Sequence, residues 1–134
     1  MILKSYEIKK INLNINNLVL FYGKNEGLKK EALNILIKDK NNISNYEEKE
    51  ILDNENNFIE NISSKSLFEI EKFIIVKRVT DKILKIIENL KQRNLKDTTI
   101  ILNSESLEKK SKLRSFFEKN KTLVCVPFYP DNDQ

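Results

Sequence analysis

The stretch Leu18-Val19-Leu20-Phe21-Tyr22-Gly23-Lys24-Asn25 decides the fold, because it places a turn directly after a buried strand. Its first five residues are continuously apolar and rich in β-branched or aromatic side chains, as in a strand covered on both faces. Gly23 ends the apolar run, and Asn25 can cap a helix that follows. The apolar side of this helix is made by Leu28, Ala32, Leu33 and Leu36.

The alternation of strand and helix continues along the chain. Further strands are predicted at Ile43–Tyr46, Phe73–Val76, Thr98–Leu102 and Thr122–Val126. Helices are predicted over Asp53–Ser63 behind an Asp53 cap, from an Asp81 cap through Ile83, Ile87 and Leu90, and through Leu113, Phe116 and Phe117 to about Asn120. Helices between strands make crossover connections, so we predict the α/β class with a mostly parallel sheet of about five strands flanked by helices.

Length and composition indicate one globular domain. The chain has 134 residues, of which 40% are hydrophobic and 33% are charged. We expect this domain to span residues 1–127, and we assign residues 128–134 to the start of a linker toward further domains. No apolar run approaches the ~18 residues that a membrane span needs, so no membrane partner is expected. The single cysteine, Cys125, excludes an internal disulfide, favours a cytoplasmic location, and is predicted to be a buried small apolar residue.

The residue types that are missing limit the chemistry. The chain has no histidine, which excludes Ser-His-Asp and Cys-His catalysis and the usual zinc sites. We predict no metal site and, together with the altered nucleotide motifs described below, no catalytic residue. The net charge is +4, but basic and acidic residues are interspersed along the chain instead of forming blocks. This pattern favours a solvated surface over a groove that binds DNA.

The segment Gly23–Lys30 stands where a phosphate-binding loop would lie, between the first strand and its helix. A working loop of this kind reads G-x-x-x-x-G-K-[ST], in which the lysine reaches the phosphates and the hydroxyl holds magnesium. Here only three residues separate the glycines, Leu28 takes the place of the lysine, and no Ser or Thr follows Lys29. We interpret Gly23, Lys24, Gly27 and Lys29 as a degenerate, non-functional nucleotide loop, and we predict no cofactor.

A second altered motif follows the strand Thr98–Leu102. In an ATPase of this topology the strand would end in Asp, with Glu close behind, to hold magnesium and polarise water. Here Asn103 takes the Asp position and carries no charge. Two altered motifs at the two expected places indicate a fold like that of P-loop NTPases, without a working nucleotide site.

Two short segments are candidates for contacts with a partner. In Ser66-Leu67-Phe68 two large apolar residues are neighbours, and neighbours on a helix point ~100° apart. Either one of them packs inward and the other is incidental, or the pair forms an apolar tip that fills a pocket of a partner. The segment Leu107–Arg114 is typical of a helix start with a solvated charged side, and a basic patch for phosphates is the alternative.

Taken in order, these segments resemble the N-terminal domain of the delta subunit of bacterial DNA polymerase III, which is part of the clamp loader. The matching stretches are Leu20–Glu26 before a helix, Ser66–Phe68 ahead of Lys72–Val76, and Leu107–Leu113 after the fourth strand. The resemblance runs from about Leu18 to Pro127. No single motif is specific, and the ordered set with its spacing carries the resemblance.

The resemblance implies an AAA+-like domain that neither binds nor hydrolyses ATP and is not an enzyme by itself. It implies that Leu67 and Phe68 insert into the hydrophobic pocket of the sliding clamp (the beta subunit), with Ser66 and Lys65 at the rim, and that the subunit opens the clamp during DNA replication. It also implies further domains that assemble the other clamp loader subunits, with DNA bound only within the full complex. We then expect the present chain to be a monomer that binds the clamp.

Two alternatives stay open from the residues alone. A P-loop NTPase or kinase with an unusual loop would contact phosphate with Lys24, Lys29 and Lys30, and would bind ATP with magnesium. A nucleic-acid-binding module would use the scattered lysines, and its affinity for DNA would fall steeply as salt rises.

Overall fold

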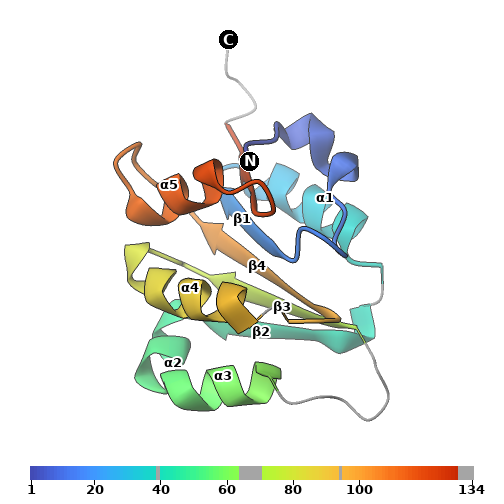
Figure 1. Ribbon diagram of the computed structural model, residues 1–134. Coiled ribbons are helices and arrows are strands. Elements are labelled where there is room, and N and C mark those ends of the chain that lie inside the picture. The colour runs from blue at the N-terminus through green and yellow to red at the C-terminus, as the bar shows by residue number, and fades with distance from the viewer. Residues whose placement is uncertain (39, 64–70, 94, 130–134) are drawn as a thin grey trace.

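The computed structural model describes residues 1–38, 40–63, 71–93 and 95–129. Its centre is a sheet of five parallel strands in the order β2-β3-β4-β1-β5 (Figure 1). The strands are β1 (Leu18–Tyr22), β2 (Ile43–Glu47), β3 (Lys72–Lys77), β4 (Thr98–Ser104) and β5 (Val124–Pro127). The predicted α/β class is confirmed, and each strand boundary lies within two residues of its prediction.

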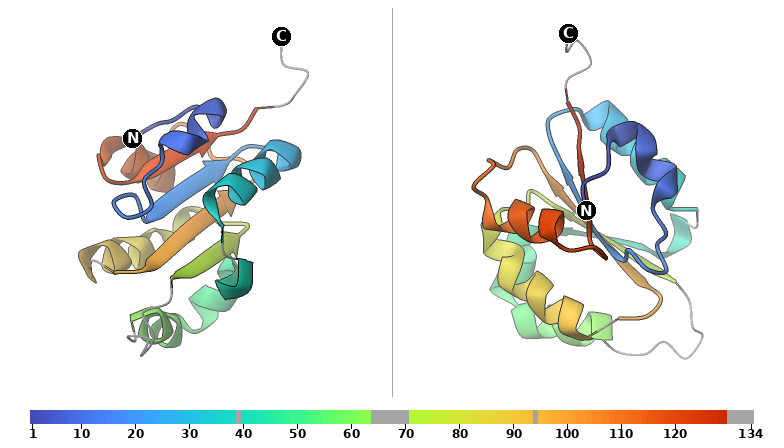
Figure 2. Two further views of the ribbon diagram at one scale, coloured as in Figure 1. Left: turned by 90° about the vertical axis from the view of Figure 1, so that its right-hand side faces the viewer. Right: turned by 45° about the horizontal axis from the view of Figure 1, so that its top comes forward.

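Helices cover both faces of the sheet. They are α1 (Glu26–Leu36), α2 (Glu48–Asp53), α3 (Glu55–Ser63), α4 (Leu84–Arg93) and α5 (Lys112–Lys119), with short 3₁₀ helices η1 (Ser5–Lys10), η2 (Lys40–Asn42) and η3 (Asp81–Ile83). Helices α2 to α5 pack on one face, whereas α1 and η1 pack on the other (Figure 2). None of the helices within the described ranges is long and apolar enough to cross a membrane.

The sheet separates two apolar cores, because successive residues of a strand point to opposite faces. In β1, Leu18 and Leu20 face the core under α2 to α5, whereas Val19 and Phe21 face the core under α1. Both faces of the central strands are therefore buried, which explains their unbroken apolar runs. The edge strand β2 is only partly buried, and its sequence is correspondingly more polar.

The first 17 residues, for which the sequence patterns predict no element, cover the α1 side of the sheet. Leu3, Ile8 and Ile11 are buried there in the same core as Val19 and Phe21. The amino group of Met1 donates to the carbonyls of Phe117 and Leu123, at 2.6 and 2.9 Å. A positive charge thus lies at the carboxyl end of α5, where the helix dipole favours it.

Three predicted boundaries differ from the structure. Asp53 is the last residue of α2, a helix that the sequence patterns do not predict, so it is not the cap of α3. Helix α5 begins at Lys112 and not near Leu107, because Ser111 caps it with its hydroxyl. Phe128, which we assigned to the linker, is fully buried in the core, so the packed domain extends past residue 127.

Asp81 caps a different helix from the one predicted. The cap of its own 3₁₀ turn is the hydroxyl of Thr80. The Asp81 carboxylate instead accepts from the backbone N–H groups of Lys112 and Leu113, at 3.1 and 3.2 Å, and from the Ser111 hydroxyl. Desolvation acts to raise the pKa of Asp81, but these three hydrogen bonds together hold that pKa below its ordinary value. Asp81 therefore fixes the amino end of α5 against the start of η3.

Candidate functional site

The carboxyl ends of β1 and β4 lie side by side at one edge of the sheet, where Tyr22 is opposite Ser104. The helices that follow these two strands leave to opposite faces, α1 to one and α5 to the other (Figures 1 and 2). In open α/β sheets, ligands bind at such a switch point outside the carboxyl ends of the strands. The predicted nucleotide loop and Asn103 both lie here, so this edge is the first candidate site.

The turn after β1 is too short to form a ring of N–H groups around a phosphate. Only three residues separate β1 from α1. Gly27 lies in the first turn of α1, which begins at Glu26. Asn25 caps α1 as predicted, because its Oδ1 accepts the N–H of Leu28 at 3.1 Å. The cap thus uses one of the helix donors that a phosphate would need.

The chain that leaves β5 closes over this turn. Gly23 has φ +123°, and a Cβ at this position would lie 2.0 Å from the carbonyl oxygen of Phe128. The N–H of Phe128 donates to the carbonyl of Tyr22 at 2.8 Å, and Nδ2 of Asn25 donates to the carbonyl of Tyr129 at 2.8 Å. Gly23 is therefore required by the close approach of two backbone segments.

Lys29 is the buried centre of this edge. Its side chain is only 1% exposed. Its Nζ donates to Oδ1 of Asn103 at 2.7 Å, to the carbonyl of Ser104 at 2.9 Å, and to Oε1 of Glu26 at 3.4 Å. An ammonium group has three N–H donors, so these three acceptors occupy it fully. The lysine predicted as a remnant of the phosphate loop is thus bonded to the end of β4.

The other residues of the predicted nucleotide site offer little for a ligand. Lys24 is exposed, and Asn103, at the position of the magnesium ligand, directs its side-chain oxygen to Lys29. Across the described ranges, no group of three His, Cys, Asp or Glu residues could hold a metal ion. Cys125 is buried, as predicted, and burial raises the pKa of its thiol to about 11. A thiol with such a pKa is not a nucleophile at neutral pH.

The residues predicted to contact a partner, Lys65, Ser66, Leu67 and Phe68, lie outside the described residues. The residues on either side of the segment are described. Ser63 ends α3, and Glu71 directly precedes β3. The segment therefore leads into the amino end of β3, whereas the Gly23 turn lies at the carboxyl ends of the strands.

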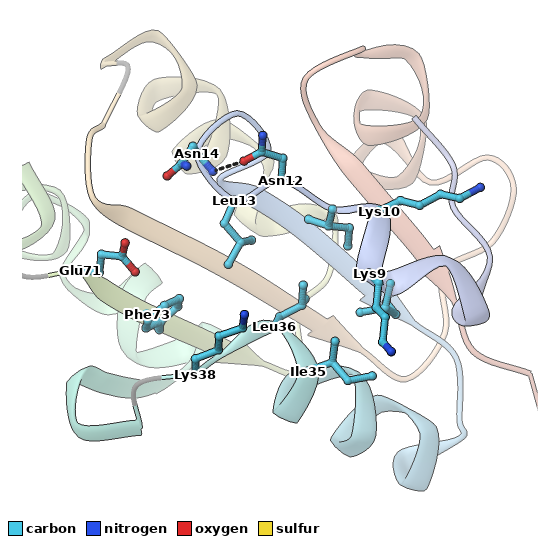
Figure 3. A pocket seen from close by; sticks show the side chains of 12 residues that line it. Lys9, Lys10, Asn12, Leu13, Asn14, Ile35, Leu36, Lys38, Glu71 and Phe73 are labelled. Atoms are coloured by element: carbon cyan, nitrogen blue, oxygen red, sulfur yellow. Dashed lines mark hydrogen bonds between the residues drawn. The ribbon is translucent and has the colours of Figure 1, made fainter.

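A groove opens beside Glu71, and no sequence pattern points to it. It has a volume of about 790 Å³ and lies between the residues after η1, the carboxyl end of α1 and the start of β3 (Figure 3). The side chains of Leu13, Ile35, Leu36 and Phe73 point into it, with Lys9 and Lys38 at its margin. A smaller hollow of about 320 Å³ shares Leu13, Asn14 and Glu71 with it.

Comparison with known proteins adds a likeness of fold. No protein-family profile matches the sequence, and no curated protein matches it by sequence. Among solved structures, the fold is similar to that of the Bacillus subtilis DNA clamp loader delta protein (YqeN), with a TM-score of 0.66 and 18% sequence identity. The match covers 92% of this chain and 41% of that protein, so this chain spans less than half of the neighbour's length. The structure is therefore an α/β fold, with five parallel strands flanked by helices, that is similar to part of the Bacillus subtilis clamp loader delta protein.

Proposed function

We propose that this chain is a clamp-loader delta-type domain that binds the sliding clamp through Leu67 and Phe68, and helps to open it during DNA replication without using ATP. The observation that carries the proposal is the combination of this fold with Lys29 bonded to the end of β4. A domain of this architecture whose buried lysine near the first turn is bonded internally is suited to binding a partner rather than to phosphoryl transfer.

The geometry at the switch point argues against the ATPase and kinase alternative. Lys29 has no donor left for a phosphate oxygen, and Asn103 lacks the negative charge of a magnesium ligand and has its side-chain oxygen bonded to Lys29. The backbone of Phe128 lies against Gly23, where phosphates would have to approach the turn. A nucleotide would need to displace all of these contacts.

The clamp-binding role of Leu67 and Phe68 rests on their sequence and their place along the chain. They stand next to each other, preceded by the polar residues Ser63, Ser64, Lys65 and Ser66. An exposed pair of large apolar side chains is a typical anchor at a protein interface. Their segment connects Ser63, the last residue of α3, to β3, whose amino end lies at the opposite end of the strands from the Gly23 turn.

The proposed action is binding, with no covalent step. A domain that binds an open ring more tightly than a closed ring shifts the population toward the open form by its differential affinity. Two apolar anchors could supply such a difference if the pocket they fill changes shape as the ring opens. The energy from ATP would then come from other subunits of the complex.

The test is the affinity of this chain for the sliding clamp of the same organism, measured by isothermal titration calorimetry. We expect saturable binding by the native chain. Each anchor contributes ~2 kcal/mol at an interface, so replacing both by alanine should weaken binding roughly a thousandfold. Absence of binding by the native chain would refute the proposal.

A matched control separates anchoring from folding. The double variant Tyr6→Ala/Tyr129→Ala removes two aromatic side chains that are 78% and 62% exposed, and it should keep the native affinity. The proposal requires both side chains to be exposed, so the Leu67→Ala/Phe68→Ala variant should unfold at nearly the native temperature. A loss of several kcal/mol in its free energy of unfolding would show that the pair belongs to the core.

A further inference from the structure

The groove beside Glu71 lies where the described elements leave part of the second face of the sheet uncovered. Among the described residues, α1, the N-terminal residues and Phe128 pack on that face, and α1 and the N-terminal residues separate near the start of β3. The floor of the groove is apolar and includes the buried side chains of Leu36 and Phe73. Ile35 also lines the groove and is 42% exposed (Figure 3).

The margin of the groove is mainly basic. Among the described residues, three lysines line it, Lys9, Lys10 and Lys38, and one acidic residue, Glu71. Lys10 is paired with Glu7 at 2.8 Å. Within the described ranges, no carboxylate forms an ion pair with Lys9 or Lys38. An apolar floor beneath two unpaired cations fits a peptide segment that carries a large apolar side chain next to acidic residues.

The position of the groove links it to the proposed clamp-binding segment. Phe68 is three residues before Glu71, so the two α-carbons lie at most about 11 Å apart even in a fully extended chain. A stable protein interface buries about 800 Å² on each partner, which corresponds to a disc roughly 32 Å across. An interface centred on Phe68 therefore has the dimensions to include the groove.

We propose that the groove is a second contact for the sliding clamp and receives an acidic segment of the clamp that carries a large apolar side chain. This inference rests on the proposed function. In such an arrangement Leu67 and Phe68 provide the main anchor. The groove adds affinity and fixes the orientation of the domain on the ring, since two separated contacts restrict rotation.

The experiment measures binding of the native chain and its variants to the sliding clamp of the same organism, at low and at physiological salt. The charge-reversal variant Lys9→Glu/Lys38→Glu should bind at least tenfold more weakly, and its affinity should depend less on salt than that of the native chain. The variant Ile35→Ser should weaken binding about tenfold by removing an apolar contact.

The control variant is Lys85→Glu/Lys91→Glu, which makes the same change in net charge on exposed residues of α4, on the other face of the sheet. It should bind the clamp within twofold of the native chain. Equal losses in both charge-reversal variants would overturn the groove proposal, because they would report net charge alone. Native affinity in both groove variants, with binding lost in Leu67→Ala/Phe68→Ala, would overturn the groove and leave the proposed function standing. No binding by the native chain would overturn both.

Discussion

Replacing Lys29 by methionine tests whether the lysine holds the carboxyl edge of the sheet together. Methionine keeps most of the apolar stem and removes the ammonium group. In the native chain this group bonds to Asn103 Oδ1 at 2.7 Å and to the Ser104 carbonyl at 2.9 Å. The contact with Glu26 at 3.4 Å contributes little, because the Glu26 side chain is 68% exposed.

The expected loss follows from these two short bonds. A hydrogen bond that involves a charged group contributes a net ~1.5 kcal/mol at the lower end of the measured range, so two of them give ~3 kcal/mol. The Ser104 carbonyl still accepts the N–H of Gly23 at 3.1 Å, which keeps the estimate at that lower end. For a domain of this size, 1 kcal/mol corresponds to roughly 4 °C in Tm, so Lys29→Met should lower Tm by about 12 °C.

The assay is thermal denaturation followed by circular dichroism, with Lys30→Met as the matched control. Lys30 is the next residue of the same helix and is exposed, so its variant should unfold within ~2 °C of the native chain. Equal Tm values for the two variants would refute the argument that Lys29 is bonded internally. An increase in stability with magnesium-ATP that Lys29→Met abolishes would instead identify Lys29 as a phosphate ligand.

The remaining predictions concern the same edge of the sheet and the cap of α5. Magnesium-ATP should not raise the Tm of the native chain; a ligand at 100 times its Kd would stabilise the fold by ~2.7 kcal/mol, and a shift of several degrees would contradict the closed site. Gly23→Ala should lower the free energy of unfolding in urea by more than 2 kcal/mol, because Gly23 has φ +123° and a Cβ there would lie 2.0 Å from the Phe128 carbonyl oxygen. The control variant Gly27→Ala should be neutral or slightly stabilising, because the atom nearest to its added Cβ would be 3.6 Å away. Asp81→Ala should cost about 1 kcal/mol at pH 7, a cap value reduced for solvent exposure. Because folding lowers the pKa of Asp81, this stabilisation is present above the pKa of the unfolded chain, near 4, and is lost as pH falls through the pKa of the folded chain. The native chain and the variant should therefore become equally stable in acid. A difference in stability that persists in acid would contradict the role of the carboxylate.

At the nucleotide loop, the local sequence predicts that the site is incomplete but does not predict the contact made by Lys29. The missing hydroxyl and the missing lysine after Gly27 are local features, and they predict a site that does not hold a nucleotide. In the structure, Lys29 is bonded to Asn103 instead of to a phosphate, and Asn103 is 74 positions away along the chain. The two altered motifs predict that these segments lie near each other, but no residue pattern indicates that Lys29 bonds to Asn103, so this contact required the folded structure.

The cap of α5 and the groove both depend on contacts between residues that are distant in the sequence. The local sequence predicts that Asp81 caps the helix that follows it, because an Asp before an apolar repeat is a common sign of a helix N-terminus. It caps α5 instead, 31 positions further along, because the turn after β3 lies beside the turn after β4. The groove joins residues 8–14, 35–38 and 71–73, and the first of these segments has no periodic pattern to predict its place.

The sequence by itself determined the strands, most of the helices and the α/β class, because burial on both faces of a parallel sheet requires continuous apolar runs that are visible residue by residue. It also determined that the nucleotide motifs are incomplete. Only the tertiary structure decided which groups bond to Lys29, why Gly23 is needed, and that Phe128 belongs to the core. Each of these depends on backbone or side-chain atoms from distant segments that approach within hydrogen-bonding or van der Waals distance, and such distances arise only when the strands are assembled in the order β2-β3-β4-β1-β5.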